Sequence, residues 1–320
     1  MIFILMNGKK SKMELLERFE NEKKTKTFRR IDNNHNLDWY IGYDENSKKA
    51  VALIINDYFI EFDSTKIIKV KLEKRIDGKL ILTFSLIDER YIDIYLKFCE
   101  DLFSFSSGIT KNVLKNVLIR WNMWKSTFKN MHNEKMSENE IKGLIGELIF
   151  LDKVMFSLYG IDNSIKCWQG PLNYHKDFEI SDNWYEVKTI SDNSLTVKIN
   201  SLQQLDNKDN KNGELAIIVL KNTNEENNDY ITISKLINSI DKKILDLNIK
   251  EIFWEKIKSS KYVFDEAYDK YVYELYRIKE YNVDNNEFPR ICSNEIREGI
   301  VKVNYEIDIE SIKKFLIEEA

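Results

Sequence analysis

Residues 176–190 constrain the fold of this chain more than any other segment. Two short runs rich in β-branched and aromatic residues, 176–180 and 184–190, flank a polar turn cluster, which is the pattern of a β-hairpin. Because side chains alternate across a strand, Glu186 and Lys188 lie on one face, while the residues between and beside them lie on the other. An acid, Asp177, opens the first strand.

The length of the turn decides how these groups meet. With a two-residue loop, Asp177 lies directly opposite Glu186; with a four-residue loop, it opposes Lys188 and is diagonal to Glu186. Both registers place two carboxylates and one ammonium on a single patch of sheet. A bulge or an odd loop would separate them.

Charge makes this patch a candidate for chemistry. Two carboxylates ~5 Å apart repel by roughly 3 kcal/mol at an effective dielectric constant near 20. A nearby lysine, a shared proton or a divalent cation would offset that repulsion, and Mg²⁺ takes one or two protein carboxylates while leaving positions for phosphate oxygens. The alternative is an exposed hairpin with an ordinary cross-strand ion pair, worth under ~1 kcal/mol.

A helix is predicted just before the hairpin. Residues 137–140, Ser-Glu-Asn-Glu, form a capping box, and apolar residues follow at helical spacing: Ile141, Leu144, Ile145, Leu148, Leu151 and Met155. Glu147 falls on or beside this stripe, where a lone carboxylate would cost several kcal/mol unless it were paired or bound to metal. It could instead be a rim residue bonded to a backbone amide or a lysine. Gly143 and Gly146 are tolerable in this helix if its backbone approaches a sheet closely.

Taken together, residues 143–148 (GLIGEL), 168–171 (WQGP), 177–178 (DF) and 185–189 (YEVKT) resemble the PD-(D/E)XK nuclease fold of restriction endonucleases and related DNA-processing enzymes. They look most like an uncharacterised group of bacterial PD-(D/E)XK-motif proteins associated with restriction and phage-defence gene clusters. Residues 196–206 resemble that group's continuation from strand into helix. The proline of the family name is missing, since Lys176 precedes Asp177.

This resemblance implies a fold and a set of roles. The fold would be α/β, a restriction-endonuclease-like core with a mixed sheet flanked by helices. Asp177 and Glu186 would bind the metal, Glu147 would support them as a further acid of the metal shell, and Lys188 would orient or activate water. The implied cofactor is Mg²⁺, with Mn²⁺ as a substitute.

The length of 320 residues favours two domains. Residues 1–130 are predicted to form an N-terminal α+β domain, a candidate recognition or partner module, with strands at 39–43, 50–55, 68–72 and 80–86 and a helical stretch after residue 91. Matching apolar faces in the 68–86 hairpin demands a three-residue loop with Gly78 in the left-handed position. Two tryptophans of the helical stretch, Trp121 and Trp124, are expected in the core.

Residues 131–320 are predicted to form the nuclease core and a C-terminal extension. A continuous apolar run, 215–220, indicates a strand buried on both faces, and residues 233–244 an amphipathic helix. Residues 262–281 are expected to end in a strand, 300–305 to form another, and 309–317 to form a final helix.

Composition narrows the classes of function. With 43% hydrophobic and 32% charged residues, the chain is typical of a globular protein. A formal net charge of −4 argues against a general nucleic-acid coat but not against a nuclease with a local basic groove. Three separated cysteines and the lack of a long apolar stretch favour reduced thiols, no membrane association and the cytoplasm. The chain has no phosphate-binding loop, so ATP-driven movement on DNA would need another polypeptide.

The sequence therefore predicts a metal-dependent DNA endonuclease in a bacterial restriction or anti-phage defence system. Its expected partners are DNA and other subunits of such a system, for example a helicase, an ATPase or a methyltransferase, and a homodimer would suit double-strand cleavage. Two alternatives stay open. One is a non-catalytic component that keeps the fold and binds nucleic acid or partner proteins; the other is a hydrolase of RNA or small molecules on the same core.

Overall fold

The structure is a computed structural model that describes residues 8–21, 27–130, 135–172, 174–206, 212–224 and 229–320. The chain divides into two compact units, Met1–His132 and Asn133–Ala320. Each unit has its own sheet and its own apolar core.

The first unit is built on a five-stranded antiparallel sheet in the order β1-β2-β3-β5-β4. Its elements are α1 (Gly8–Glu20), β1 (Phe28–Arg30), β2 (Asp38–Tyr43), β3 (Lys49–Ile55), β4 (Ile68–Lys74), β5 (Leu80–Leu86), α2 (Ile92–Ser106) and α3 (Val113–Asn130). In the β4–β5 hairpin, Leu72 pairs with Leu82 and Val70 with Phe84, as the matching of apolar faces predicts. Gly78 has a φ of 84°, which confirms the left-handed position in that loop.

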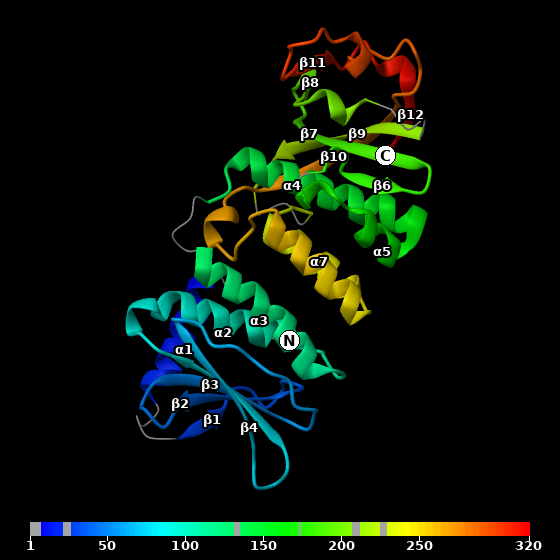
Figure 1. Cartoon of the computed structure of the whole chain (residues 1–320). Helices are drawn as coiled ribbons and strands as arrows, with labels where there is room; N and C mark the ends of the chain where they lie inside the picture. Colours follow the sequence, from blue (N-terminus) through cyan, green and yellow to red (C-terminus); the bar gives the residue numbers. More distant parts are fainter. Residues whose placement is uncertain (1–7, 22–26, 131–134, 173, 207–211, 225–228) are drawn as a thin grey trace. The chain divides into compact units, whose positions relative to one another are not determined.

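Helices α2 and α3 lie against this sheet (Figure 1) and contribute aromatic residues to the core of the unit. The ring of Phe98 contacts those of Phe84, Trp121 and Trp124, with centroids 5.2–5.6 Å apart. Trp121 and Trp124 are both buried, so their predicted place in the core is confirmed.

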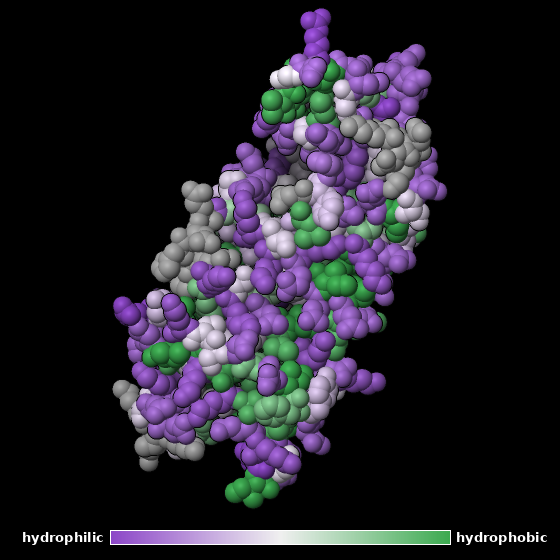
Figure 2. Space-filling model, viewed as in Figure 1, coloured by the Kyte–Doolittle hydropathy of each residue, from purple (hydrophilic) through white to green (hydrophobic). Residues whose placement is uncertain are grey.

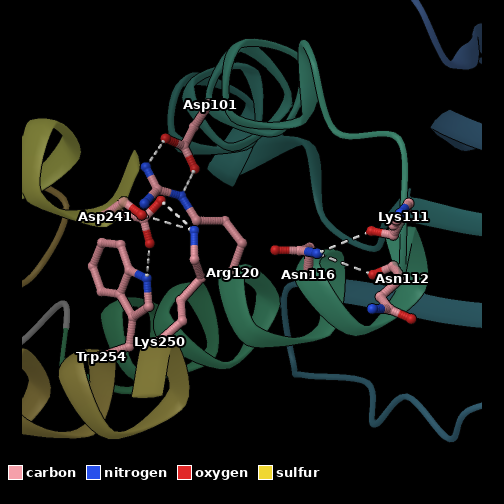
Figure 3. Close-up of polar contacts among 8 residues, drawn as sticks. All are labelled: Asp101, Lys111, Asn112, Asn116, Arg120, Asp241, Lys250 and Trp254. Atoms are coloured by element: carbon pink, nitrogen blue, oxygen red, sulfur yellow. Dashed lines mark hydrogen bonds and ion pairs between the residues drawn. The ribbon is translucent and has the colours of Figure 1, made fainter. Parts of the chain in front are cut away.

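Each unit also contains an aspartate that pairs with a buried basic side chain (Figure 3). In the first unit, Asp101 accepts hydrogen bonds from the guanidinium of Arg120, and its Oδ2 also accepts one from the indole of Trp124 at 2.7 Å. In the second unit, Asp241 accepts from Lys250 Nζ at 3.1 Å and from Trp254 Nε1 at 2.7 Å. Because the charges are paired and hydrogen-bonded, their burial is tolerated.

The second unit contains a mixed sheet in the order β12-β10-β9-β7-β6. Strands β7 and β9 are parallel and the other pairs antiparallel, which confirms a mixed α/β fold. The elements are α4 (Glu138–Phe150), a π-helical turn (Leu151–Met155), α5 (Phe156–Cys167), β6 (Phe178–Ile180), β7 (Asn183–Ser191), β8 (Thr196–Ile199), β9 (Asn212–Asn222), α6 (Ile233–Lys243), α7 (Leu247–Ser259), β10 (Tyr273–Asn282), β11 (Tyr305–Asp308) and β12 (Leu316–Glu319).

The two faces of this sheet are covered differently (Figure 1). Helix α4 packs so closely on one face that a Cβ on Gly146 would fall 1.8 Å from the Thr189 hydroxyl, which explains the glycine. Gly143 meets nothing within 4 Å, so the predicted close approach is wrong for that residue. On the other face, apolar residues of β7 and β9 pack with the two-stranded β8–β11 sheet.

The C-terminal end differs from the predicted pattern. Residues 309–317 do not form a helix: a 3₁₀ turn, Lys313–Phe315, leads into β12, which pairs with β10 and becomes the edge strand of the sheet. Ile312 and Phe315, two apolar residues of this segment, are buried at the turn. Strand pairing with β10 therefore overrides the helical spacing of the apolar residues. The strand predicted at 300–305 is also wrong, because β11 begins at Tyr305, where pairing with β8 begins.

Between β8 and β9 the described residues contain a short 3₁₀ turn, Leu202–Gln204, in place of the predicted helix. Helix α7 was not predicted.

The visible surface in Figure 2 is largely hydrophilic, with apolar residues in separate patches. In the part of the chain that the structure describes, no helix has both the length and the apolar character needed to cross a membrane.

Candidate active site

The hairpin β6–β7 takes the two-residue turn. Phe178 pairs with Tyr185 and Ile180 with Asn183, so Ser181 and Asp182 form the loop. Extending this register by one residue places Asp177 opposite Glu186, the first of the two predicted arrangements. Asp177 Oδ2 accepts a hydrogen bond of 2.8 Å from the backbone N–H of Val187, which fixes one side of its carboxylate.

Glu186 and Lys188 form an ion pair on one face of β7. The Nζ of Lys188 lies 2.7 Å from Oε1 of Glu186, and both side chains are largely removed from solvent. Glu186 is 1% exposed, which is unusual for a glutamate and requires the ammonium beside it.

Glu147 reaches the same region from α4. The capping box at Ser137 is present, and the predicted apolar stripe of the helix is buried. Among the described residues, the hydrogen-bond donor to Glu147 is an indole rather than a backbone amide or a lysine: its Oε2 accepts a hydrogen bond of 2.8 Å from Nε1 of Trp168, a fully buried side chain.

Gly170 shows how close Glu147 and Asp177 are. A Cβ on Gly170 would fall 2.2 Å from Glu147 Oε2 and 2.8 Å from Asp177 Oδ1. The two oxygens are therefore no farther apart than the sum of these distances. The backbone N–H groups of Gln169 and Gly170 both donate to the backbone oxygen of Asp177, at 2.7 and 3.1 Å, so this turn is fixed against the strand.

The charges of these groups act on one another. Burial and the charge of Asp177 raise the pKa of Glu147 well above its usual range, and the same two causes raise the pKa of Glu186 to about 8. Burial also raises the pKa of Asp177. Burial lowers the pKa of Lys188, but the three carboxylates outweigh it and the net shift is upward. The four predicted residues thus form one electrostatically coupled site.

A comparison with known protein families matches most of the chain. Residues 11–310 match the model of the family described as "Putative PD-(D/E)XK family member, (DUF4420)". The chain belongs to this PD-(D/E)XK family. Searches of the curated proteins and of the solved structures returned no match.

PD-(D/E)XK nucleases use divalent metals, and the donor set here is of the right kind. Carboxylate oxygens are hard ligands, as Mg²⁺ and Mn²⁺ prefer. The space above Gly170 is bordered by oxygens of two acids. Burial and then the charge of Asp177 raise the pKa values of Glu147 and Glu186, and a bound cation would offset both effects. Within the described residues, no three His, Cys, Asp or Glu side chains are already arranged as a metal-binding group.

Three site-building residues were not predicted for their roles in this PD-(D/E)XK chain. Trp168 holds Glu147, and Gly170 leaves space beside the acids. Lys176 donates to the backbone oxygens of Gln204 and Asp206, both at 2.9 Å, and lies 3.3 Å from the ring centre of Trp184. The sequence signals for these residues are the segment 168–171, which contributes to the family resemblance, and the position of Lys176 directly before the first acid.

Proposed function

We propose that this protein is a metal-dependent endonuclease that hydrolyses phosphodiester bonds of DNA. The observation that carries the proposal is the convergence of Glu147, Asp177, Glu186 and Lys188 from one helix and one hairpin, in a chain of the PD-(D/E)XK family. A purely structural cluster would gain nothing from three coupled acids at one place, because each adds repulsion and desolvation cost.

The role proposed for each acid follows from the hydrogen bonds that it already makes. Asp177 is fixed through Oδ2 by the Val187 N–H, and its Oδ1 lies near the space above Gly170. Glu147 is held by Trp168 on the same oxygen that lies near that space. We assign Asp177 and Glu186 as the principal metal ligands and Glu147 as the supporting acid.

Lys188 is assigned to the attacking water and to the charge that develops on the phosphate. Its ammonium has three donors, and the one used by Glu186 leaves others for a water or a phosphate oxygen. Such a donor, fixed in a partly buried site, stabilises negative charge more than it would in water. A bound Mg²⁺ would supply Lewis-acid polarisation of the phosphate and a lowered pKa for a coordinated water.

The setting of this activity is a further part of the proposal. A role in bacterial restriction or anti-phage defence, with partner subunits such as a helicase, an ATPase or a methyltransferase, is supported by the resemblance carried by residues 143–148, 168–171, 177–178 and 185–189. The first unit, with its separate sheet and core, is proposed to recognise the target or a partner.

The test is cleavage of supercoiled plasmid by the purified protein with Mg²⁺ or Mn²⁺. Asp177→Asn and Lys188→Met should remove cleavage, while Asp182→Asn, an exposed acid in the turn of the same hairpin, should retain it. The assay is repeated with the products of neighbouring genes, since a partner-dependent enzyme is silent alone. Salt-sensitive DNA binding without cleavage under every condition would support the non-catalytic alternative instead.

A further inference from the structure

Lys256 is a buried lysine that has no role in the candidate active site as described above. It lies on α7, is 6% exposed, and donates to three backbone oxygens: those of Ile165 at 2.7 Å, Lys166 at 2.8 Å and Trp168. No carboxylate is among these partners. An ammonium has three donors and no acceptor, so three converging carbonyls use it fully.

These carbonyls belong to the end of α5 and the residue that follows it. The last carbonyls of a helix lack partners within the helix, and a lysine near this end satisfies them and interacts favourably with the helix dipole. The backbone N–H of Trp168 caps α5 by donating to Ser164. Lys256 therefore fixes the point at which the chain leaves the helix and enters the turn beside the acids.

The same face of α7 also holds the Trp168 ring. Phe253 is three residues before Lys256, one turn away on the helix surface, and its ring lies 6.2 Å from the Trp168 ring, centre to centre. Trp168 is thus held by its carbonyl and by its indole face, both from α7. Its Nε1 remains for Glu147.

We propose that Lys256 is a positioning residue of the candidate active site: it holds Trp168 in place, and Trp168 in turn holds Glu147 beside Asp177. The proposal rests on the function proposed above for this site. Lys256 has no role in the chemistry itself, because none of its partners is a site acid. It acts through the turn at residues 168–170, whose N–H groups also bind the Asp177 backbone.

The test compares two buried lysines of one helix. Lys256→Met removes the three donors and keeps the apolar stem. Lys250→Met does the same at a residue that is 7% exposed and donates to Asp241, so it controls for lost stability. The first readout is the indole ¹H–¹⁵N resonance of Trp168, assigned by its loss in Trp168→Phe. The second is Mn²⁺ affinity by calorimetry.

Lys256→Met should weaken the hydrogen bond from the Trp168 indole to the Glu147 carboxylate and so move the Trp168 resonance upfield. It should also weaken Mn²⁺ binding roughly 10-fold, the lower end of the losses found when residues that orient metal ligands are mutated. Lys250→Met should move the Trp254 resonance and leave both the Trp168 resonance and Mn²⁺ affinity as in the native protein. An unmoved Trp168 resonance in Lys256→Met, or equal effects of the two variants, would overturn the proposal.

Two further outcomes are separable. If the native protein binds no Mn²⁺, the proposed function fails, whereas the Trp168 resonance still decides the positioning role. If Lys256→Met does not fold, Lys256→Arg serves: its planar guanidinium keeps the charge but does not match three converging carbonyls, so a smaller shift of the same resonance and a smaller loss of affinity are expected. If Lys256→Arg folds and has the native Trp168 resonance and the native Mn²⁺ affinity, the proposal is contradicted.

Discussion

Lys188 Nζ lies 2.7 Å from Glu186 Oε1, and the two residues are separated by a single position on β7. Alternation along the strand places both on one face, so the ion pair is a direct consequence of the Glu-x-Lys spacing. Both groups are buried, so the ammonium favours the ionised form of Glu186, which burial and the charge of Asp177 oppose.

Lys188→Met should therefore affect stability in a pH-dependent way. Glu186 already has a pKa raised to about 8 by burial and by Asp177, and loss of the ammonium raises this pKa further. Below pH 8 the folded state of both proteins keeps this proton, and the variant loses little. Stability falls with pH from about 4.5, where the unfolded state loses the proton; in the native protein the fall ends near pH 8, whereas in the variant it continues to higher pH. Thermal melts at pH 6 and pH 9 measure this, with Lys142→Met on α4 as the control. A loss independent of pH would contradict the account.

Asp177→Asn should stabilise the metal-free protein while it removes cleavage. The substitution deletes one of three mutually repelling carboxylates and keeps an oxygen that can accept the Val187 N–H. The expected gain is about 1–3 kcal/mol at pH 9, set by like charges at close range, and less at pH 6, where Glu186 is protonated. Chemical denaturation without divalent ions measures it. Asp182→Asn should show no such gain, and a destabilised Asp177→Asn would argue against mutual repulsion.

Two glycine-to-alanine substitutions distinguish an effect on metal binding from an effect on the stability of helix α4. In Gly170→Ala the new Cβ must displace the oxygens of Glu147 and Asp177, so Mn²⁺ affinity should fall at least about 10-fold. In Gly143→Ala the Cβ meets nothing within 4 Å, and the helix should gain about 1 kcal/mol of stability with unchanged Mn²⁺ affinity. Calorimetry and melts on both variants provide the comparison. Equal Mn²⁺ affinities would mean that the space above Gly170 plays no part in metal binding.

Glu280 offers a test of buried charge away from the site. Burial, followed by the charge of Glu214, raises its pKa to about 7, so between pH 4.5 and 7 the folded state holds a proton that the unfolded state has lost. Stability therefore falls as pH rises through this window. Glu280→Gln does not titrate and can still donate to Glu214, so it should be more stable than the native protein at pH 8, by about 1–3 kcal/mol, and equally stable at pH 4.

Melts across this pH range test the prediction, with Glu274→Gln on the same strand as the control for the substitution itself. A constant difference between Glu280→Gln and the native protein at all pH values would show that the two acids do not share a proton.

Local rules were sufficient for much of the site. Parity along β7 predicts the shared face of Glu186 and Lys188. The hairpin pattern leaves two registers open, and the structure has the one with the two-residue turn, which places Asp177 opposite Glu186. The capping box at Ser137 predicts the start of α4, and the matched apolar faces of β4 and β5 predict the loop at Gly78. In each example the determining residues are close in sequence.

The remaining features depend on contacts between distant segments. Trp168 bonds to Glu147 across a helix and a turn, and Lys256 reaches Trp168 from a separate helix, so no spacing rule reveals either. At the C-terminal end, Leu316 and Ile317 fit a helical stripe, yet they become a strand because the edge of β10 is open to pairing. Tertiary pairing decided this segment, which local periodicity cannot report.

The most direct test of the central claim is the anomalous diffraction of a crystal soaked in Mn²⁺. The account predicts one peak at coordination distance, about 2.2 Å, from carboxylate oxygens of Asp177 and Glu186, with Glu147 bound directly or through water and Lys188 beside it. The peak should vanish in Asp177→Asn. A Mn²⁺-soaked crystal with no peak among these acids, or with its peak held by other residues, would contradict the claim that they form a metal-dependent hydrolytic site.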